Sequence, residues 1–135
     1  MSLVQSVKNQ PIMVEKYVSL PATAGTTVGI AVPAGTLVLA AGFEPSVTVP
    51  DVSVYTFDIT DGTTTFANDL SLDNTAAGTI RVSATAGLVA AADTLDIVTT
   101  ITGSPGVVTG RLFAVIIDVN ENAAEATDVD RDQLA

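Results

Sequence analysis

The chain of 135 residues contains no cysteine, no histidine and no tryptophan. Without cysteine it can form neither a disulfide nor a thiolate metal site, and without histidine it lacks the commonest ligand of zinc and copper. The same two absences remove most nucleophile–base pairs, so a serine or threonine has no histidine to activate it. The sequence therefore predicts a protein that is not an enzyme and that needs no cofactor.

Positive charge is also scarce. Five lysines and arginines stand against fifteen aspartates and glutamates, which gives a formal net charge of −10. This charge disfavours binding to nucleic acid or to an anionic membrane. Charged residues make up only 15% of the chain, against about 25% in an average soluble domain. The deficit indicates that a partner covers part of the surface.

Long hydrophobic runs are missing as well. The longest apolar stretches fall well short of the roughly 18–20 residues that a membrane-spanning helix needs. The start of the chain lacks the long apolar core of a signal peptide. We therefore expect neither an export signal nor a membrane segment.

Strand-forming residues are abundant instead. Valine and threonine are β-branched, occur nineteen times each and favour strands. Strand-like stretches separated by turn signals recur at spacings of about 8–12 residues, which is typical of an all-β antiparallel sandwich, here jelly-roll-like. The stretches are 12–20, 26–32, 36–41, 46–49, 52–60, 63–67, 79–85, 94–101 and 110–119.

Turn residues define several connections. Pro33-Ala34-Gly35 predicts a tight turn, and Asp61-Gly62 predicts a type I′ hairpin with positive φ at both residues. Residues 42–45 are expected to end the strand that begins at residue 36. Residues 86–92 fit either a short helix, because alanine and leucine favour helix, or an irregular connection.

Alternation predicts which side chains share a face. Residues 110–119 are apolar on both faces, which indicates a central strand. In 79–85, Arg81 and Ser83 are expected outside. Ile80, Val82 and Ala84 of the same segment are expected inside. The apolar faces predicted in the other segments comprise Val28, Ile30, Val32, Tyr55, Phe57 and Ile59.

The strand pattern divides the chain into three parts. Residues 1–11 form an N-terminal arm, 12–119 the β-sandwich domain, and 120–135 an acidic tail that is expected to be mobile. The arm has two interpretations that the sequence leaves open: it adds a strand to the sheet edge of a neighbouring molecule, or it is an ordinary disordered terminus.

Two aspartate clusters are candidate sites. Asp58, Asp61 and Gly62 in DITDG suggest a calcium loop, but the spacing is not that of a twelve-residue calcium loop and a hairpin turn is favoured. Asp93 and Asp96 suggest a catalytic pair, but alternation places them on opposite faces of a strand. We therefore expect no metal site and no catalytic residue.

Two further binding patterns are weak. The glycine-containing segments 22–27 and 102–110 lack the spacing of phosphate-binding loops. Tyr55 and Phe57 share a strand face and could form an aromatic platform for carbohydrate, although core positions are favoured for both.

The order of four segments, VPAGTLVLAAGF, VSVYTFDITDGT, TAGLVAAADTLDIVTT and TGRLFAVIIDVNE, resembles small β-sandwich structural proteins of tailed bacteriophages. These include capsid decoration (cement) proteins and related head or tail accessory proteins. The resemblance covers about residues 18–120. It implies a non-enzymatic virion protein, made in the host cytoplasm and seated on the capsid surface, where it binds the major capsid protein and forms a homotrimer.

The resemblance also implies where the lattice contact lies. Arms commonly make that contact, so the candidates are Leu3, Val4, Val7, Lys8, Pro11, Ile12 and Val14. Two other functions remain open at this point: a tail or head-fibre accessory protein of a phage, and a carbohydrate-binding module.

Overall fold

The computed structural model describes residues 10–118, and within that range every regular element is a β-strand. The expectations for Leu3, Val4, Val7, Lys8 and the acidic tail therefore lie outside the described residues. The strands are β1 (Ile12–Leu20), β2 (Gly25–Val32), β3 (Thr36–Pro45), β4 (Val54–Thr60), β5 (Thr65–Ser71), β6 (Arg81–Ser83), β7 (Gly87–Val89), β8 (Asp93–Thr102) and β9 (Val108–Asp118).

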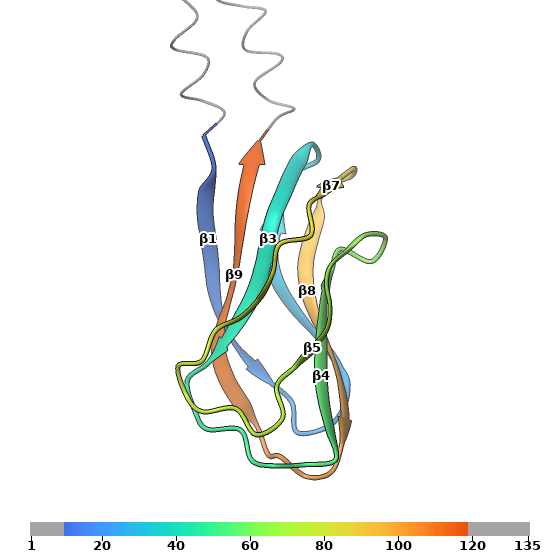
Figure 1. The fold of residues 1–135 in the computed structure, drawn as a ribbon. Helices are drawn as coiled ribbons and strands as arrows, with labels where there is room; N and C mark the ends of the chain where they lie inside the picture. Colours follow the sequence, from blue (N-terminus) through green and yellow to red (C-terminus); the bar gives the residue numbers. More distant parts are fainter. Residues whose placement is uncertain (1–9, 119–135) are drawn as a thin grey trace, which may run out of the picture.

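The strands form two antiparallel sheets that pack face to face (Figure 1). Sheet A has the order β1-β9-β3-β6, with β7 also paired to β3, and sheet B has the order β2-β8-β4-β5. If β6 and β7 are counted as one edge position, this is the strand order of a jelly roll. The predicted all-β sandwich is confirmed, and so is the central place of β9 between β1 and β3.

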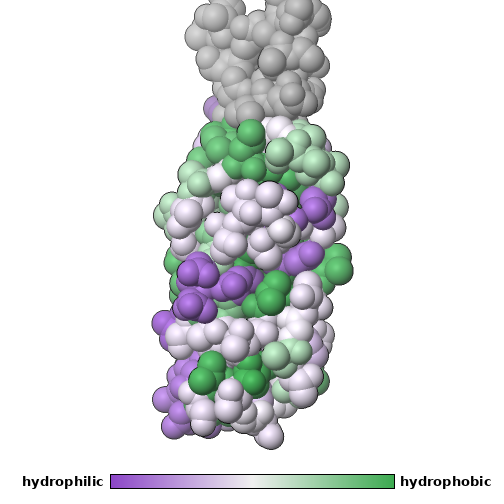
Figure 2. Space-filling model, turned by 90° about the vertical axis from the view of Figure 1, so that its right-hand side faces the viewer, coloured by the Kyte–Doolittle hydropathy of each residue, from purple (hydrophilic) through white to green (hydrophobic). Residues whose placement is uncertain are grey.

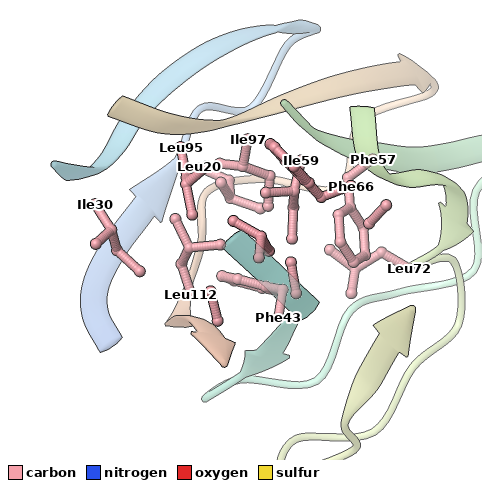
Figure 3. Close-up of a cluster of buried hydrophobic side chains, with 14 of the residues drawn as sticks. Leu20, Ile30, Phe43, Phe57, Ile59, Phe66, Leu72, Leu95, Ile97 and Leu112 are labelled. Atoms are coloured by element: carbon pink, nitrogen blue, oxygen red, sulfur yellow. The ribbon is translucent and has the colours of Figure 1, made fainter. Parts of the chain in front are cut away.

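The core fills the space between the sheets (Figure 3). Most inward-facing side chains of both sheets are buried, as the period of two requires, whereas Ile12 at the start of β1 is exposed. Phe43 of sheet A meets Phe57 of sheet B edge to face, with ring centroids 6.0 Å apart. The other large buried side chains include Leu20, Tyr55, Ile59, Phe66, Leu72, Leu95, Ile97 and Leu112. The predicted inward face of β4 is thus confirmed.

Two turns differ in how far their prediction holds. Gly35 has φ of 83°, and its N–H donates to the carbonyl of Val89, so the turn at 33–35 is confirmed. The β4–β5 hairpin also forms, but only Gly62, and not Asp61, has positive φ. The type I′ turn was therefore wrong. The Asp61 carboxylate instead accepts hydrogen bonds from the N–H groups of Thr63 and Thr64, which holds the loop.

Three connections were predicted wrongly or left open. Residues 42–45 do not interrupt the strand that begins at residue 36. They are the last four residues of β3, which runs to Pro45. The backbone of β6 lies so close to Gly42 that a Cβ there would clash with the Arg81 carbonyl oxygen, so the glycine allows β3 and β6 to pair. Residues 46–49 form no strand. Residues 86–92 contain the short strand β7 and no helix.

Two predicted apolar faces are also corrected. Val28 is 59% exposed because the β2–β8 register shifts between Thr27 and Ile30, and this bulge turns the valine away from the core. In 79–85 the predicted faces are reversed. Val82 is 50% exposed, whereas Arg81 is half-buried and its guanidinium donates to the Thr75 hydroxyl.

Tyr55 places a polar atom in the core. Its side chain is completely buried, and its hydroxyl has no hydrogen-bond partner among residues 10–118. Burial raises the pKa of Tyr55 to about 12. A buried hydroxyl without a partner destabilises the folded state by about 1 kcal/mol or more.

Replacing this tyrosine, Tyr55→Phe, is therefore expected to raise the free energy of unfolding by about 1 kcal/mol at pH 7. The folded pKa lies above the unfolded value of about 10, so the stability of the wild type is complete below pH 10 and declines as pH rises toward 12, by about 2–3 kcal/mol. Tyr55→Phe should lack this share of the alkaline loss.

Urea unfolding of both proteins between pH 8 and pH 12 measures the difference. Parallel pH profiles for the two proteins would contradict the burial of an ionisable phenol at this position.

Candidate interaction surface

The two solvent-facing sides of the sandwich differ in chemistry. The outer face of sheet B is rich in threonine, and the strand register places Thr56 opposite Thr100 and Thr60 opposite Asp96. Threonines on this face that are at least partly exposed are Thr26, Thr56, Thr60, Thr65, Thr94, Thr100 and Thr102. One side of the molecule, shown in Figure 2, is mostly of intermediate hydropathy, with apolar clusters near both ends of the sandwich.

The outer face of sheet A is apolar instead. Cross-strand pairs here join Met13 to Val115 and Leu37 to both Ile117 and Leu88. Apolar side chains on this face are Met13, Tyr17, Leu37, Ala40, Val82, Leu88, Phe113, Val115 and Ile117, and all except Phe113 are at least partly exposed. We call this set the sheet A face. Apolar side chains on a solvated sheet face are unusual, because that side of an antiparallel sheet is commonly polar.

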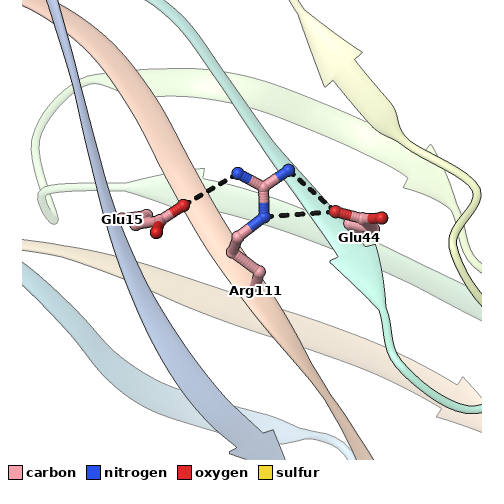
Figure 4. A network of polar contacts seen from close by, with 3 residues as sticks. All are labelled: Glu15, Glu44 and Arg111. Atoms are coloured by element: carbon pink, nitrogen blue, oxygen red, sulfur yellow. Dashed lines mark hydrogen bonds and ion pairs between the residues drawn. The ribbon is translucent and has the colours of Figure 1, made fainter.

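The charged groups on the sheet A face form one cluster, in which a single arginine pairs with two glutamates. Arg111 of β9 lies between Glu15 of β1 and Glu44 of β3 (Figure 4). Its Nη1 is 2.8 Å from Glu15, and its Nη2 and Nε are 2.7 and 3.1 Å from one oxygen of Glu44. These hydrogen bonds raise the pKa of Arg111 above its ordinary value. The guanidinium also lies over the ring of Phe113, 5.1 Å from its centroid.

Strand β1 provides a second candidate surface, the free edge of sheet A. All nine of its residues pair in register with β9, and no bulge interrupts them. The other sheet edges of the described chain are interrupted: β6 and β7 have three residues each, β2 has a bulge, and β5 has two register shifts. A long regular edge presents unpaired backbone groups to another chain.

The lattice-contact candidates that the structure describes lie at the start of this edge. Pro11 precedes β1 and is exposed, Ile12 is 57% exposed, and Val14 is half-buried. Ile12 pairs with Ile116 of β9, so β1 begins and β9 ends at the same end of the sandwich (Figure 1). The structure therefore places Pro11, Ile12 and Val14 together at that end.

The aspartate clusters serve the fold. The Asp58 carboxylate accepts the N–H of Asp69 at 2.7 Å, and Asp61 holds the hairpin loop, so the hairpin interpretation is confirmed. The Asp96 carboxylate accepts the Thr94 hydroxyl at 2.6 Å and the N–H of Gly29 at 3.3 Å. Between residues 10 and 118 no group of three acidic side chains is arranged to hold a metal ion, and no helix there could span a membrane.

Aromatic residues do not form the platform that was considered. Tyr55 and Phe57 are 0% and 1% exposed, so both belong to the core. The aromatic residues that the sequence did not mark as candidates are Tyr17, Phe43, Phe66 and Phe113, and of these only Tyr17 is exposed, at 71%. The signal that could have found it is alternation along 12–20, which places Tyr17 on the same face as Glu15 and Ser19. It borders a shallow depression whose lining residues are Tyr17, Glu44, Pro45, Ser46, Ala77, Gly78 and Arg111.

Comparison with known proteins finds structural neighbours only. No protein-family model matches the chain, and no curated protein matches it. Its fold is similar to a chain in the capsid asymmetric unit of cyanophage Pam1, with a TM-score of 0.59 and 12% identity over 80% of this chain and 84% of that chain. It is also similar to a chain in the acid-stable capsid of Helicobacter pylori bacteriophage KHP30, with a TM-score of 0.53 and 17% identity over 80% and 91%. At these identities the similarity shows a shared fold.

Proposed function

We propose that this protein is a non-enzymatic structural subunit of a phage virion, and specifically a capsid decoration (cement) protein. In this role it binds the major capsid lattice as a homotrimer at the capsid surface. The observation that carries the proposal is the fold, which most of the chain shares with chains of two phage capsid structures. The order of sequence segments that resembles phage decoration proteins supports the same role.

The surfaces of the sandwich suit a protein that works by contact. The described residues offer the open backbone edge of β1 and an apolar sheet face, while Asp61 holds a turn and Glu15 and Glu44 pair with Arg111. A stable protein interface buries about 1,200–2,000 Å² in total. A trimer multiplies modest single contacts through a raised effective concentration, and a subunit that binds only the assembled shell stabilises it by mass action.

The lattice contact is assigned to the arm and to the edge that follows it. The arm residues Leu3, Val4, Val7 and Lys8 lead directly through Pro11 to β1. An extended segment of a capsid subunit can pair with a free strand edge through main-chain hydrogen bonds. Of the sheet edges described, β1 is the regular one that could accept such a segment.

Co-sedimentation tests this function. Purified protein is mixed with phage capsids stripped of their accessory proteins, and the pellet is analysed for saturable binding at a fixed ratio to the major capsid protein. We expect saturation and a higher temperature of capsid disruption. A protein that stays in the supernatant at all concentrations would refute the decoration role.

The tail or head-fibre alternative predicts a different location in the same virion. Gold-labelled antibody against this chain should decorate the shell evenly if the proposal is right. Label confined to the tail or to a single vertex would favour the accessory role. The carbohydrate-binding alternative required Tyr55 and Phe57 at the surface, and both are buried in the core. Binding to glycans on an array would be the result that favours it.

A further inference from the structure

We propose that the sheet A face is the surface on which a second copy of this chain packs. The inference rests on the self-association part of the proposed function and assigns it to named residues. It starts from the difference between the two outer faces of one sandwich. Both face solvent in the single chain, yet threonine dominates one face and aliphatic side chains dominate the other.

The exposed apolar side chains lie along both margins of the sheet A face. Met13 and Tyr17 stand on β1 at one margin, 55% and 71% exposed. Val82 and Leu88 stand on β6 and β7 at the other, 50% and 49% exposed. Between the margins lie the buried ring of Phe113 and the paired charges of Arg111. The two apolar margins gain free energy when water leaves them, and the centre between them holds only paired side chains, with one net negative charge.

Charge decides which partner fits this face. The chain carries a formal charge of −10, so two copies repel each other wherever carboxylates meet. The aspartates whose side chains the structure describes all lie on sheet B or in loops at the ends of the sandwich. They are Asp51, Asp58, Asp61, Asp69, Asp73, Asp93 and Asp96. Both glutamates on the sheet A face are bound to Arg111. Two copies can therefore approach through this face with the least repulsion.

The available area matches a modest protein interface. Four strand positions spaced about 4.8 Å apart and about nine residues long cover about 600 Å². Two copies that packed whole face to whole face would bury about 1,200 Å² in total, the lower end of the range for specific complexes, and a contact between one margin of each copy would bury less. We expect an association that is specific and that depends on protein concentration.

The two margins also fit a closed ring. A ring of three subunits needs a contact between two different patches, so that each copy offers one patch to each neighbour. The β1 margin of one copy against the β6–β7 margin of the next satisfies this requirement. The same contact leaves the free edge of β1, which is made of backbone groups, open to the capsid.

The experiment introduces one charge on each outer face. Val82→Glu places a carboxylate on the sheet A face, and Leu88→Glu does so at a second position of the same margin. Val28→Glu is the matched control, because Val28 is a valine of similar exposure on sheet B. Sedimentation velocity of the full chain between 1 and 100 μM gives the oligomer dissociation constant, and far-UV circular dichroism checks the fold.

The expected result is at least a tenfold rise in the dissociation constant for Val82→Glu and for Leu88→Glu, and a change within twofold for Val28→Glu. A wild type that stays monomeric at 100 μM would overturn the inference. Folded Val82→Glu and Leu88→Glu variants that keep the oligomeric mass of the wild type would also overturn it. If such variants lost only capsid binding, the sheet A face would instead contact the capsid.

Co-sedimentation of the same proteins with stripped capsids separates this inference from the proposed function. A wild type that forms oligomers through the sheet A face but does not bind capsids would refute the decoration role and leave the self-association surface standing.

Discussion

Removal of residues 1–11 is expected to lower the affinity for stripped capsids by at least about 100-fold, or about 2.7 kcal/mol. The arm carries the apolar residues Leu3, Val4 and Val7, and burying one such side chain contributes about 1.5–3 kcal/mol. The truncation leaves β1 intact from Ile12, and Pro11 is exposed, so the thermal midpoint should change by less than about 2 °C. Co-sedimentation and thermal unfolding measure the two effects.

Removal of residues 120–135 is the control for this truncation. It shortens the other terminus and removes acidic residues to which the proposed function gives no part in the lattice contact. We expect capsid binding to stay within about threefold of the full chain, which is below 1 kcal/mol. Full binding by the protein that lacks residues 1–11 would move the lattice contact from the arm to the sandwich.

The second large effect is expected in the core. Phe43→Ala should lower the free energy of unfolding by about 3–5 kcal/mol, because it removes a fully buried ring and leaves a cavity. The edge-to-face contact with Phe57 joins the two sheets and is lost as well. Single domains are stable by only about 5–15 kcal/mol, so this one change removes a large share. Urea unfolding followed by circular dichroism gives the value.

Tyr17→Ala is the matched aromatic control. Tyr17 is 71% exposed, so its removal should change the free energy of unfolding by no more than about 0.5 kcal/mol. A loss below 1 kcal/mol for Phe43→Ala, or similar losses for both variants, would contradict the packing of the two sheets described above.

Alternation predicted strands well where one face is buried and the other is polar. Residues 52–60 show this, since Tyr55, Phe57 and Ile59 point inward and Thr56 and Asp58 outward. Alternation gives the wrong face for Val28 because a bulge adds one residue to β2, and a period of two cannot predict where a bulge occurs. Gly42 was also predicted to end the strand that begins at residue 36, although it lies within β3, where the close approach of β6 requires a residue without a Cβ.

The error at residues 79–85 has a different cause. Alternation assumes that the apolar face points to the core, and it therefore placed Val82 inside and Arg81 outside. In the structure Val82 points outward from sheet A, while the guanidinium of Arg81 reaches the buried Thr75. A sheet whose outer face is itself apolar breaks the assumption. The candidate surface could not be found from the sequence for the same reason, because it is assembled from five strands that only the topology brings together.

The position of the chain ends has a practical consequence for attaching cargo to a virus particle. β1 begins and β9 ends at one end of the sandwich, and the β8–β9 loop lies at the other, about 35 Å away along β9. Ser104 in that loop is exposed. With the arm anchored on a shell, a peptide inserted beside Ser104 would stand clear of the particle surface, and each bound subunit would present one copy to antibodies or receptors.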